Sequence, residues 1–488
     1  MCTVGALLFI INLISEFISF LFKYLDLHLN LMKYDAIVVG AGSAGCRAAY
    51  AIAKNDFDVC LIDAKPRDRI GDKICGNAIG DHHLKRIGLT LPSGIITNSV
   101  EGLTIYSPNL HELQIPGGEY SGKMIDRLMC GQYFLNQAID AGTILKDRAV
   151  VTGPIIEDDS VKGVEVYSKE KIYAEIIIDA SGLRSPIRPR LKESWAIETQ
   201  IDDKDINLAY REIRRVKRLG DGNYCNLYFN QNLYPGGYAW IFPQSEDMVN
   251  VGLGVQKVKG CPNPRERLYE TLLKDELFKG SEVVNMHGIK QAGGMEVSTR
   301  RSLSSLVWDG LVIAGEAGMV MDPVIGSGHG QAIVTGEFAG RVVADALKRN
   351  EASKKGLWHY NLMHYAEDGY GPKYTAIDAF RIYLQSSRPE HVDFAVEHRL
   401  FEAEDLLNLT TKGKLSFSDK LKKVIRGIEN PSLLMELYDI RNVMDSIYDH
   451  CLSYPNSFEG LFGWKSKIDQ IFSKLEEQFE PYAKYYKD

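Results

Sequence analysis

The sequence lacks any long run of basic residues, and its net charge is mildly acidic. Its 488 residues include 57 lysines and arginines against 64 aspartates and glutamates, a formal net charge of −7. A protein that follows a nucleic-acid backbone needs a concentrated basic surface. We therefore expect no nucleic acid among its partners.

Cysteine is sparse and unpaired in sequence. The chain has 8 cysteines, none of them in a CxxC pair or in the dense pattern of small secreted proteins. Cysteine alone therefore predicts neither a zinc nor an iron–sulfur centre, and we predict no metal site. The pattern favours a reducing interior and hence a cytoplasmic location.

Internal repeats and low-complexity linkers are also missing. The length is about three typical domain lengths. Hydrophobic residues make up 45% and charged residues 25% of the chain, which is the globular average and excludes a disordered, collagen-like or polytopic membrane protein. We expect two or three folded domains.

Residues 1–31 form a separate, apolar extension. The run from Val4 to Phe22 is broken by Ser15, Glu16 and Ser19, has no basic start and no cleavage site, and so disfavours a signal peptide. Two interpretations stay open. The extension is either an upstream start, with Met32 as the natural beginning, or an anchor that lies on a membrane surface, since Glu16 opposes full spanning.

A βαβ unit follows from Tyr34. Residues 35–40 read as a buried strand, 46–54 as a helix and 58–63 as a second strand. Between the first strand and the helix lies Gly40-x-Gly42-x-x-Gly45, a turn that brings backbone amides against a pyrophosphate. Asp63 ends the second strand, where a carboxylate can accept hydrogen bonds from ribose hydroxyls. This arrangement predicts dinucleotide binding.

Further motifs indicate which dinucleotide. They are Asp179-Ala-Ser-Gly182, Gly315-Glu-Ala-Gly318, Asp322-Pro-Val-Ile-Gly-Ser-Gly-His-Gly330, Arg69-Ile-Gly-Asp-Lys-Ile-Cys75-Gly76 and Tyr238-Ala-Trp240-Ile-Phe242-Pro243 followed by Gly252-Leu-Gly254. With the opening turn they resemble the FAD-containing geranylgeranyl reductase family, and within it the archaeal reductases that saturate the isoprenoid chains of membrane lipids. The resemblance runs from about Met32 to the carboxyl terminus.

The resemblance implies an α/β (α+β) fold. An FAD-binding, Rossmann-like domain of the aromatic-hydroxylase type would carry an inserted antiparallel-sheet substrate domain and a helical carboxyl-terminal region. We assign residues 32–83, 124–200 and 299–350 to the FAD domain, 84–123 and 201–298 to the substrate sheet, and 351–488 to the helices. Strands of the sheet are expected near 226–229, 237–242 and 249–256.

The site residues follow from the same resemblance. Cofactor contacts are expected at Gly40, Gly42, Ala44, Gly45, Asp63, Cys75, Gly76, Ala78, Arg127, Ala149, Glu316, Gly328 and His329, and catalytic roles at Cys75, Tyr238 and Trp240. One position departs from the family, which has Asp where this chain has Glu316. The longer side chain makes this the least certain cofactor contact.

The residues themselves support several of these roles. A helix that begins near Gly328 would direct its positive end at the flavin ring. Tyr238, Trp240 and Phe242 alternate along a strand and so share one face, where they could line an apolar tunnel or fill a sheet core. Arg127 is expected to open a helix. Cys75 could donate a proton, act as a redox partner or only pack, and His82 and His83 are expected on the surface.

The predicted activity is reduction of isolated isoprenoid double bonds with reduced FAD as the hydride source. The alternatives are an FAD-dependent monooxygenase or halogenase of the same fold, or an electron-transfer flavoprotein dehydrogenase. The expected partners are a polyprenyl lipid, the inner membrane surface and an external electron donor, because no second dinucleotide motif is evident. Ferredoxin, a deazaflavin and NAD(P)H all remain open as donors.

Overall fold

The computed structural model describes residues 33–117, 121–217, 222–414 and 426–480. The prediction for residues 1–31 lies outside these ranges. Within them, no helix is both long and apolar enough to cross a membrane.

The first sheet is mostly parallel and carries the dinucleotide motif. Its strand order is β20-β21-β11-β1-β2-β8, with β9 and β10 added beside β11. The pairs β11–β1, β1–β2, β2–β8 and β11–β21 are parallel, as predicted for strands buried on both faces. The bounds are β1 Lys33–Val39, β2 Val59–Ile62, β8 Ile144–Lys146, β9 Val151–Glu157, β10 Ser160–Val166, β11 Lys171–Asp179, β20 Val307–Trp308 and β21 Leu311–Ile313.

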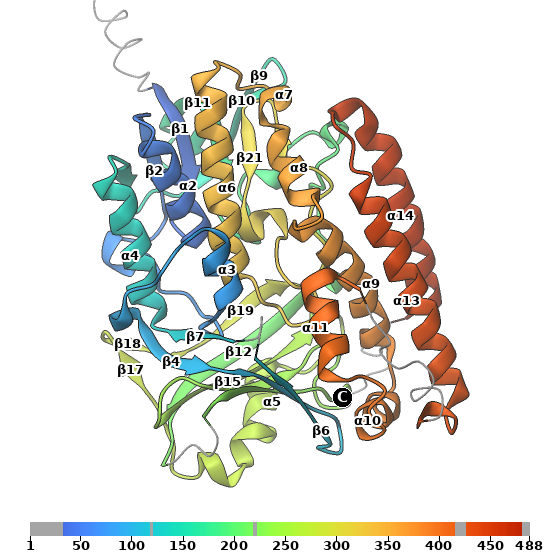
Figure 1. The fold of residues 1–488 in the computed structure, drawn as a ribbon. Helices are drawn as coiled ribbons and strands as arrows, with labels where there is room; N and C mark the ends of the chain where they lie inside the picture. The colour runs from blue at the N-terminus through green and yellow to red at the C-terminus, as the bar shows by residue number, and fades with distance from the viewer. Residues whose placement is uncertain (1–32, 118–120, 218–221, 415–425, 481–488) are drawn as a thin grey trace, which may run out of the picture.

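Three helices pack around this sheet: α2 Ser43–Ala53, α4 Arg127–Asp140 and α6 His329–Lys348. In Figure 1, α2 and α6 run side by side in front of β1 and β11. Their close approach depends on glycine, because a Cβ on Gly336 would lie 2.1 Å from the carbonyl oxygen of Ala44, and one on Gly340 would lie 2.5 Å from that of Ala48. The contact brings the first turns of both helices to one edge of the sheet.

The second sheet is mainly antiparallel, with the order β16-β12-β15-β14-β13-β5-β6 and with β19 beside β12. One pair, β5 with β13, is parallel. The three strands predicted from sequence are β13, β14 and β15. The bounds are β5 Gly102–Tyr106, β6 Glu112–Pro116, β12 Ile206–Arg215, β13 Tyr224–Tyr228, β14 Ala239–Pro243, β15 Met248–Gln256, β16 Glu282–Val283 and β19 Ala292–Ser298.

A smaller sheet joins the two. β3 Ala78–Gly80 and β4 Ile96–Val100 both pair with β7 Gly122–Ile125. β4 thus belongs to this small sheet, whereas β5 and β6, which follow it in the chain, join the second sheet. The other short elements are α3 Asp81–Arg86, α5 Pro264–Glu270 and the hairpin β17 Asn285–Met286 with β18 Ile289–Lys290.

The carboxyl-terminal region is helical, as predicted, and packs beside both sheets (Figure 1). α9 is almost wholly buried and has α13 along one side. The bounds are α7 Lys354–Leu357, α8 His359–Tyr365, α9 Tyr370–Ser386, α10 Pro389–Glu397, α11 Ala403–Lys412, α13 Pro431–Leu452 and α14 Leu461–Gln478.

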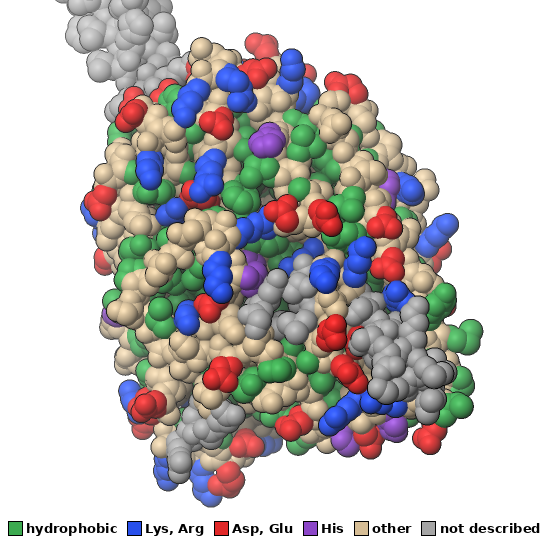
Figure 2. Space-filling model, in the orientation of Figure 1, with side chains coloured by type: hydrophobic (Ala, Val, Ile, Leu, Met, Phe, Trp, Pro, Cys, Tyr) green, Lys and Arg blue, Asp and Glu red, His purple; other side chains and the backbone are tan. Residues whose placement is uncertain are grey.

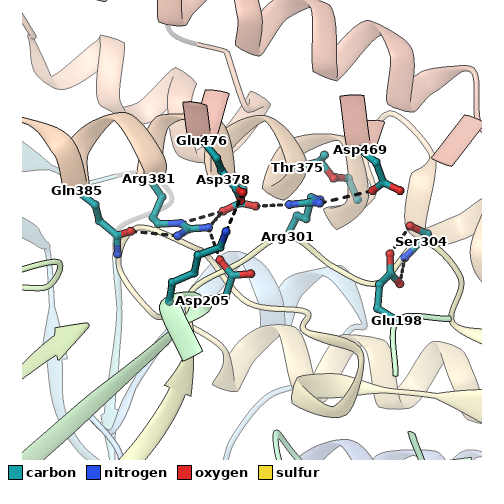
Figure 3. Close-up of polar contacts among 12 residues, drawn as sticks. Glu198, Asp205, Arg301, Ser304, Thr375, Asp378, Arg381, Gln385, Asp469 and Glu476 are labelled. Carbon is teal, nitrogen blue, oxygen red and sulfur yellow. Dashed lines mark hydrogen bonds and ion pairs between the residues drawn. The ribbon is translucent and has the colours of Figure 1, made fainter. Parts of the chain in front are cut away.

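A buried ionic network ties these helices to the rest of the chain (Figure 3). Asp378 on α9 is fully buried and lies 2.5 Å from Arg381 Nη2 and 3.2 Å from Arg301 Nη1. Arg381 also reaches Asp205, at 3.0 Å, just before β12. Arg301 precedes β20 and β21 of the first sheet, so one carboxylate links three parts of the fold.

Candidate active site

The glycine turn has the geometry that close backbone packing requires. Gly40 has a φ of +95°, and a Cβ there would lie 2.6 Å from the carbonyl oxygen of Ala180. A Cβ on Gly45 would lie 1.8 Å from the carbonyl oxygen of Gly40. Gly42, by contrast, faces open space, with no atom within 4 Å of the Cβ position. The turn therefore leaves room in front of the α2 amino terminus, where Ala44 is buried in the first helical turn.

Asp63 lies at the neighbouring strand end and holds the turn. Its Oδ2 accepts a hydrogen bond from the Ala41 amide at 2.7 Å, and its Oδ1 accepts one from the Lys65 amide at 2.8 Å. Ala149 donates its amide to the Asp63 carbonyl at 2.9 Å. The structure thus brings Asp63 and Ala149 together beside the glycine turn, as the family pattern predicts for a ribose site.

The α6 amino terminus lies at the same edge. Gly328 precedes the helix, and no side chain caps its first amides. His329 Nε2 is 2.9 Å from Ser43 Oγ on α2, whereas His329 Nδ1 is buried and has no hydrogen-bond partner among the described residues. Burial holds the pKa of His329 well below its ordinary value, so the ring is neutral.

Arg127 has donor atoms at this edge that suit an anionic group. It is the first residue of α4, as predicted, and Asp126 caps that helix by accepting from the Met129 amide at 2.9 Å. The Arg127 Nε and Nη1 atoms are buried and lack any partner among the described residues. A buried guanidinium needs a compensating acceptor, and a dinucleotide phosphate or ribose would supply it. These residues therefore fit FAD.

Glu316 makes a different contact from the one predicted. It lies in a 3₁₀ turn, Gly315–Gly318, and its Oε2 is 2.9 Å from Lys73 Nζ. Lys73 belongs to the loop that leads to Cys75. The ribityl contact of Glu316 stays a prediction, and its carboxylate ties that loop to the 3₁₀ turn.

A cavity extends from this edge toward the second sheet. Cys75, Gly76, Ala78, Gly328 and His329 line its cofactor side, and Tyr238, Trp240 and Phe242 line its sheet side. The alternation predicted from sequence is therefore real: the three aromatic side chains face one space. Gly76 packs against Phe242, where an added Cβ would lie 3.1 Å from the ring.

Small residues create the room for the aromatic wall. A Cβ on Gly252 would lie 2.4 Å from Trp240 Cζ2. The Trp240 ring is 6.0 Å from Tyr238 and 6.2 Å from Phe242, centroid to centroid. Tyr238 donates its hydroxyl proton to the Ile325 carbonyl, and burial raises its pKa. Tyr238 is thus a neutral wall residue whose proton is already engaged.

Asn250 connects the wall to the cysteine loop and was missed from sequence. It is fully buried on β15, accepts a hydrogen bond from Trp240 Nε1 at 3.0 Å and donates one to the Cys75 carbonyl at 2.9 Å. The available signal was a single polar residue inside the apolar strand 249–255. A buried amide in such a strand indicates a specific partner.

A second cavity continues from the first and is almost wholly apolar. The two share Leu103, Leu227, Asp322, Val324 and Ile325. The second runs between strands β5, β6 and β13 and helices α9, α10, α11 and α13, where leucine, isoleucine and phenylalanine predominate. The two cavities therefore adjoin at these shared residues, and the first of them begins at the predicted cofactor edge.

The expectation for His83 was wrong. His83 is only 3% exposed, and its Nδ1 lies 2.8 Å from the Tyr370 hydroxyl of α9. Burial lowers its pKa well below the ordinary value. The local sequence resembles a surface turn, but α9, which comes much later in the chain, covers it. His82 is partly exposed and lines the first cavity.

Two family models match the chain. The geranylgeranyl reductase catalytic domain matches residues 205–290, and glucose inhibited division protein A matches residues 35–196. The first match covers β12 to β15 with the aromatic wall, and the second covers the glycine turn, Asp63 and Arg127.

The chain is also similar to curated and structurally solved proteins over most of its length. A digeranylgeranylglycerophospholipid reductase of Sulfolobus acidocaldarius is 32% identical over 453 residues, 91% of this chain and 98% of that protein. A second, from Methanopyrus kandleri, is 28% identical over 83% of this chain and 98% of its own length.

Solved structures share the fold. A geranylgeranyl bacteriochlorophyll reductase-like protein of Thermoplasma acidophilum aligns with a TM-score of 0.68 at 22% identity, over 84% of this chain and 100% of that one. A flavin-dependent brominase aligns with a TM-score of 0.60 at 20% identity, over 84% and 99%. The predicted fold class is thereby confirmed.

Proposed function

The chain belongs to the digeranylgeranylglycerophospholipid reductase family, and from that premise we propose that it is an FAD-dependent reductase that saturates isoprenoid double bonds of archaeal-type membrane ether lipids or their precursors. The observation that carries the proposal is a cavity with an aromatic wall at the predicted dinucleotide edge, adjoined by a second cavity with an almost wholly apolar lining. A polyprenyl chain offers no charge to bind, so its site must be apolar and enclosed.

The cofactor is held by the residues at the sheet edge. Gly42 leaves space for the pyrophosphate, Arg127 offers two unpartnered donors, and the α6 amino terminus at Gly328 favours negative charge on the ring system. When bound and reduced, FAD supplies hydride. The open space, the orphaned guanidinium and the uncapped helix all fit that group.

The aromatic wall orients the alkene and excludes water. An isolated trisubstituted double bond resists hydride attack unless protonation leads or accompanies it, and positive charge then develops on the tertiary carbon. The ring faces of Trp240 and Tyr238 can stabilise that charge in a dry site. Cys75 lines the same cavity, and its carbonyl accepts a hydrogen bond from Asn250, which also contacts Trp240; we propose that Cys75 contacts the cofactor and the substrate.

The partners follow from the site. We propose a polyprenyl lipid as substrate, an external donor such as ferredoxin, a deazaflavin or NAD(P)H, and peripheral attachment to the inner membrane face of the cytoplasm. Acidic and basic side chains are interspersed over the face seen in Figure 2. Apolar insertion, rather than one strongly basic surface, would therefore dominate contact with lipid on that face.

A second candidate deserves a direct test because a brominase shares the fold. Halogenases and monooxygenases need oxygen to reoxidise the flavin, whereas in a reductase the alkene takes the electrons. The purified FAD-loaded protein should be reduced with dithionite under strict anaerobiosis and mixed with a geranylgeranyl lipid. Flavin absorbance and lipid mass are then recorded.

A reductase restores the oxidised flavin spectrum without air and yields product two mass units heavier per reduced bond, as the addition of two hydrogens requires. A saturated lipid of equal length is the control and should leave the flavin reduced. Flavin that stays reduced until air enters, with an oxygenated or halogenated product, would contradict the proposal.

A further inference from the structure

Asp322 lies in the turn that separates the Gly315–Gly318 segment from α6. Its Oδ1 accepts hydrogen bonds from the Val324 amide at 2.9 Å and the Ile325 amide at 3.1 Å. The Gly326 amide donates to its backbone carbonyl at 3.0 Å, and its own amide donates to the Ser327 carbonyl at 2.8 Å. The carboxyl group is therefore held in one orientation by the backbone around it.

The position of this side chain is unusual for an acid. Asp322 is only 4% exposed and lines both apolar cavities, at their junction. Its neighbours on the shared lining are aliphatic: Leu103, Leu227, Val324 and Ile325. A carboxyl group placed there lies on the path that a prenyl chain would follow.

The second oxygen of the carboxyl group is free. Among the residues that the structure describes, none donates a hydrogen bond to Asp322 Oδ2, and none forms an ion pair with it within 4.0 Å. The charged or titratable groups that act on it are Lys373 on α9 and Tyr238 before β14. A buried carboxyl group with one oxygen unpaired is more stable protonated.

Burial raises the pKa of Asp322, since the charged form would lose its hydration. The two backbone hydrogen bonds and the positive charge of Lys373 oppose this effect. Tyr238 cannot supply the proton instead, because its hydroxyl group already donates to the Ile325 carbonyl. Asp322 thus combines a carboxyl group whose pKa is raised by burial with a place in the lining of both cavities.

We propose that Asp322 is the proton donor of the reductase reaction, an inference that rests on the function proposed above. The π electron pair of the alkene takes the Asp322 proton and forms one new C–H bond. Hydride from the reduced cofactor forms the second C–H bond at the other carbon, so C=C becomes CH–CH. Asp322 is left as a carboxylate and regains a proton from water after the product departs.

The substitution Asp322→Asn separates this role from the structural one. An asparagine oxygen still accepts the Val324 and Ile325 amides, so the turn, the FAD content and lipid binding should stay as in the wild type. Removal of a general acid should slow single-turnover alkene reduction about 10²- to 10⁴-fold. Asp322→Glu, which restores an acid at a shifted position, should recover part of that rate.

Asp393→Asn is the matched control. Asp393 is also buried and caps a turn, accepting from the Asn109 amide at 2.9 Å and from Ser107 Oγ at 2.6 Å, but it lines neither cavity. The turnover of Asp393→Asn should stay within about twofold of the wild-type turnover. We expect the wild-type rate to fall as the pH rises through the titration of Asp322. The residual rate of Asp322→Asn should not show this fall.

Infrared spectra of the substrate-free, FAD-loaded protein provide a readout that does not depend on turnover. The carbonyl stretch of a protonated carboxylic acid, shifted in D₂O, should be present at neutral pH, should weaken in Asp322→Asn and should be unchanged in Asp393→Asn. A spectrum in which Asp322→Asn alters no such stretch overturns the assignment, even if that variant is inactive.

Turnover supplies the other decisive outcomes. An active wild type with an equally active Asp322→Asn shows that the proton comes from elsewhere, while the function proposed above stands. If Asp322→Asn loses FAD or lipid binding, the role of Asp322 is to cap the turn, and the inference is also overturned. A wild type that never reduces the lipid removes the proposed function itself.

Discussion

At Gly42, the effect of a side chain on cofactor binding can be separated from its effect on folding. The Gly42 Cβ position is empty, whereas a Cβ on Gly45 meets the Gly40 carbonyl at 1.8 Å. Gly42→Leu should therefore fold with a thermal midpoint close to that of the apo wild type but purify colourless, because its side chain fills the pyrophosphate space. Flavin absorbance relative to protein absorbance measures this.

Gly45→Ala is the contrasting control. Its methyl group has no space even without a cofactor, so this variant should lose stability, by about 3 kcal/mol or more, in apo and holo protein alike. A Gly42→Leu protein with full flavin content would show that the pyrophosphate lies elsewhere.

His364 on α8 should make the fold sensitive to acid. It is buried, its Nε2 has no partner among the described residues, and burial lowers its pKa to about 3. At a pH above about 6.5, the ordinary histidine pKa, the His364 ring is neutral in both the folded and the unfolded chain, so it does not make stability depend on pH. Below that pH, only the unfolded chain takes up a proton, so stability should fall by about 1.4 kcal/mol per pH unit.

The measurement is the free energy of unfolding between pH 7 and 4 for wild type and His364→Leu. The wild-type slope should exceed that of His364→Leu by about 1.4 kcal/mol per pH unit, because the buried His83 and His329 are present in both proteins and their effects cancel in the difference. His359→Leu, at the exposed start of the same helix, should keep the wild-type slope. An identical slope in all three proteins would rule out His364 as the cause.

At this scale the sequence predicted the residues whose role depends on their near neighbours. The glycines, Asp63 and Arg127 act through a turn, a strand end and a helix start, and each is visible locally. Asn250, Asp322 and His83 acquire their environments from β14, the cavity and α9. No local pattern encodes those contacts. Asn250 was therefore not identified, Asp322 was identified only as the start of a family motif, and for His83 the opposite environment was predicted.

The strand pair β14–β15 is the element on which substrate chemistry should depend. Trp240→Ala removes the central ring of the wall and should cost about 3 kcal/mol of stability, leave FAD content near normal and lower turnover of long prenyl substrates at least tenfold. Flavin content and the single-turnover rate are both measured, to distinguish a role of Trp240 in the cavity wall from a role in the sheet core alone. Equal loss of both would mark Trp240 as a core residue only.

Trp240→Phe tests the hydrogen bond separately. It keeps an aromatic face but leaves Asn250 Oδ1 without its donor, which costs about 1–3 kcal/mol when buried. We expect its turnover to lie between those of the wild type and Trp240→Ala. Turnover as low as in Trp240→Ala would instead assign the effect to Asn250 and the cysteine loop it holds.

Element positions were predicted better than element partners. The strands at 226–229, 237–242 and 249–256 match β13, β14 and β15, because alternating aromatic and β-branched residues mark a sheet face. The pairing of β4 with β7, and the parallel pairing of β5 with β13, were not anticipated. Which strands pair depends on the path of the chain between them, and the composition of a strand carries no information on that path.

For the whole molecule, the ionic network around Asp378 is a buried polar connection between the helical region and both sheets (Figure 3). Asp378→Asn leaves Arg381 and Arg301 with too little negative charge in a buried site. We expect a loss of about 3–5 kcal/mol, measured by denaturant unfolding of the FAD-loaded protein. Asp469→Asn, whose carboxylate is 46% exposed and 3.8 Å from Arg301, should cost less than about 1 kcal/mol.

A small effect of Asp378→Asn, comparable with that of Asp469→Asn, would mean that water or a rearranged carboxylate compensates the two arginines. The domain boundaries assigned from sequence stay a prediction at this scale.

The parallel pairing of β5 with β13 has a consequence for the order of folding. β5 and its antiparallel neighbour β6 are synthesised early, but the parallel neighbour β13 emerges only after the whole of β11 has left the ribosome. β21, which pairs with β11 in the first sheet, comes later still. Such pairings join distant parts of the chain. They form slowly, because the entropy lost on closing a long loop precedes the stabilising contacts. The nascent protein must therefore keep strand edges unpaired until residues near 313 appear, and the apolar side chains of the second cavity uncovered until α9, α10, α11 and α13 have been made. We expect chaperones that bind extended apolar segments to bind it during this interval.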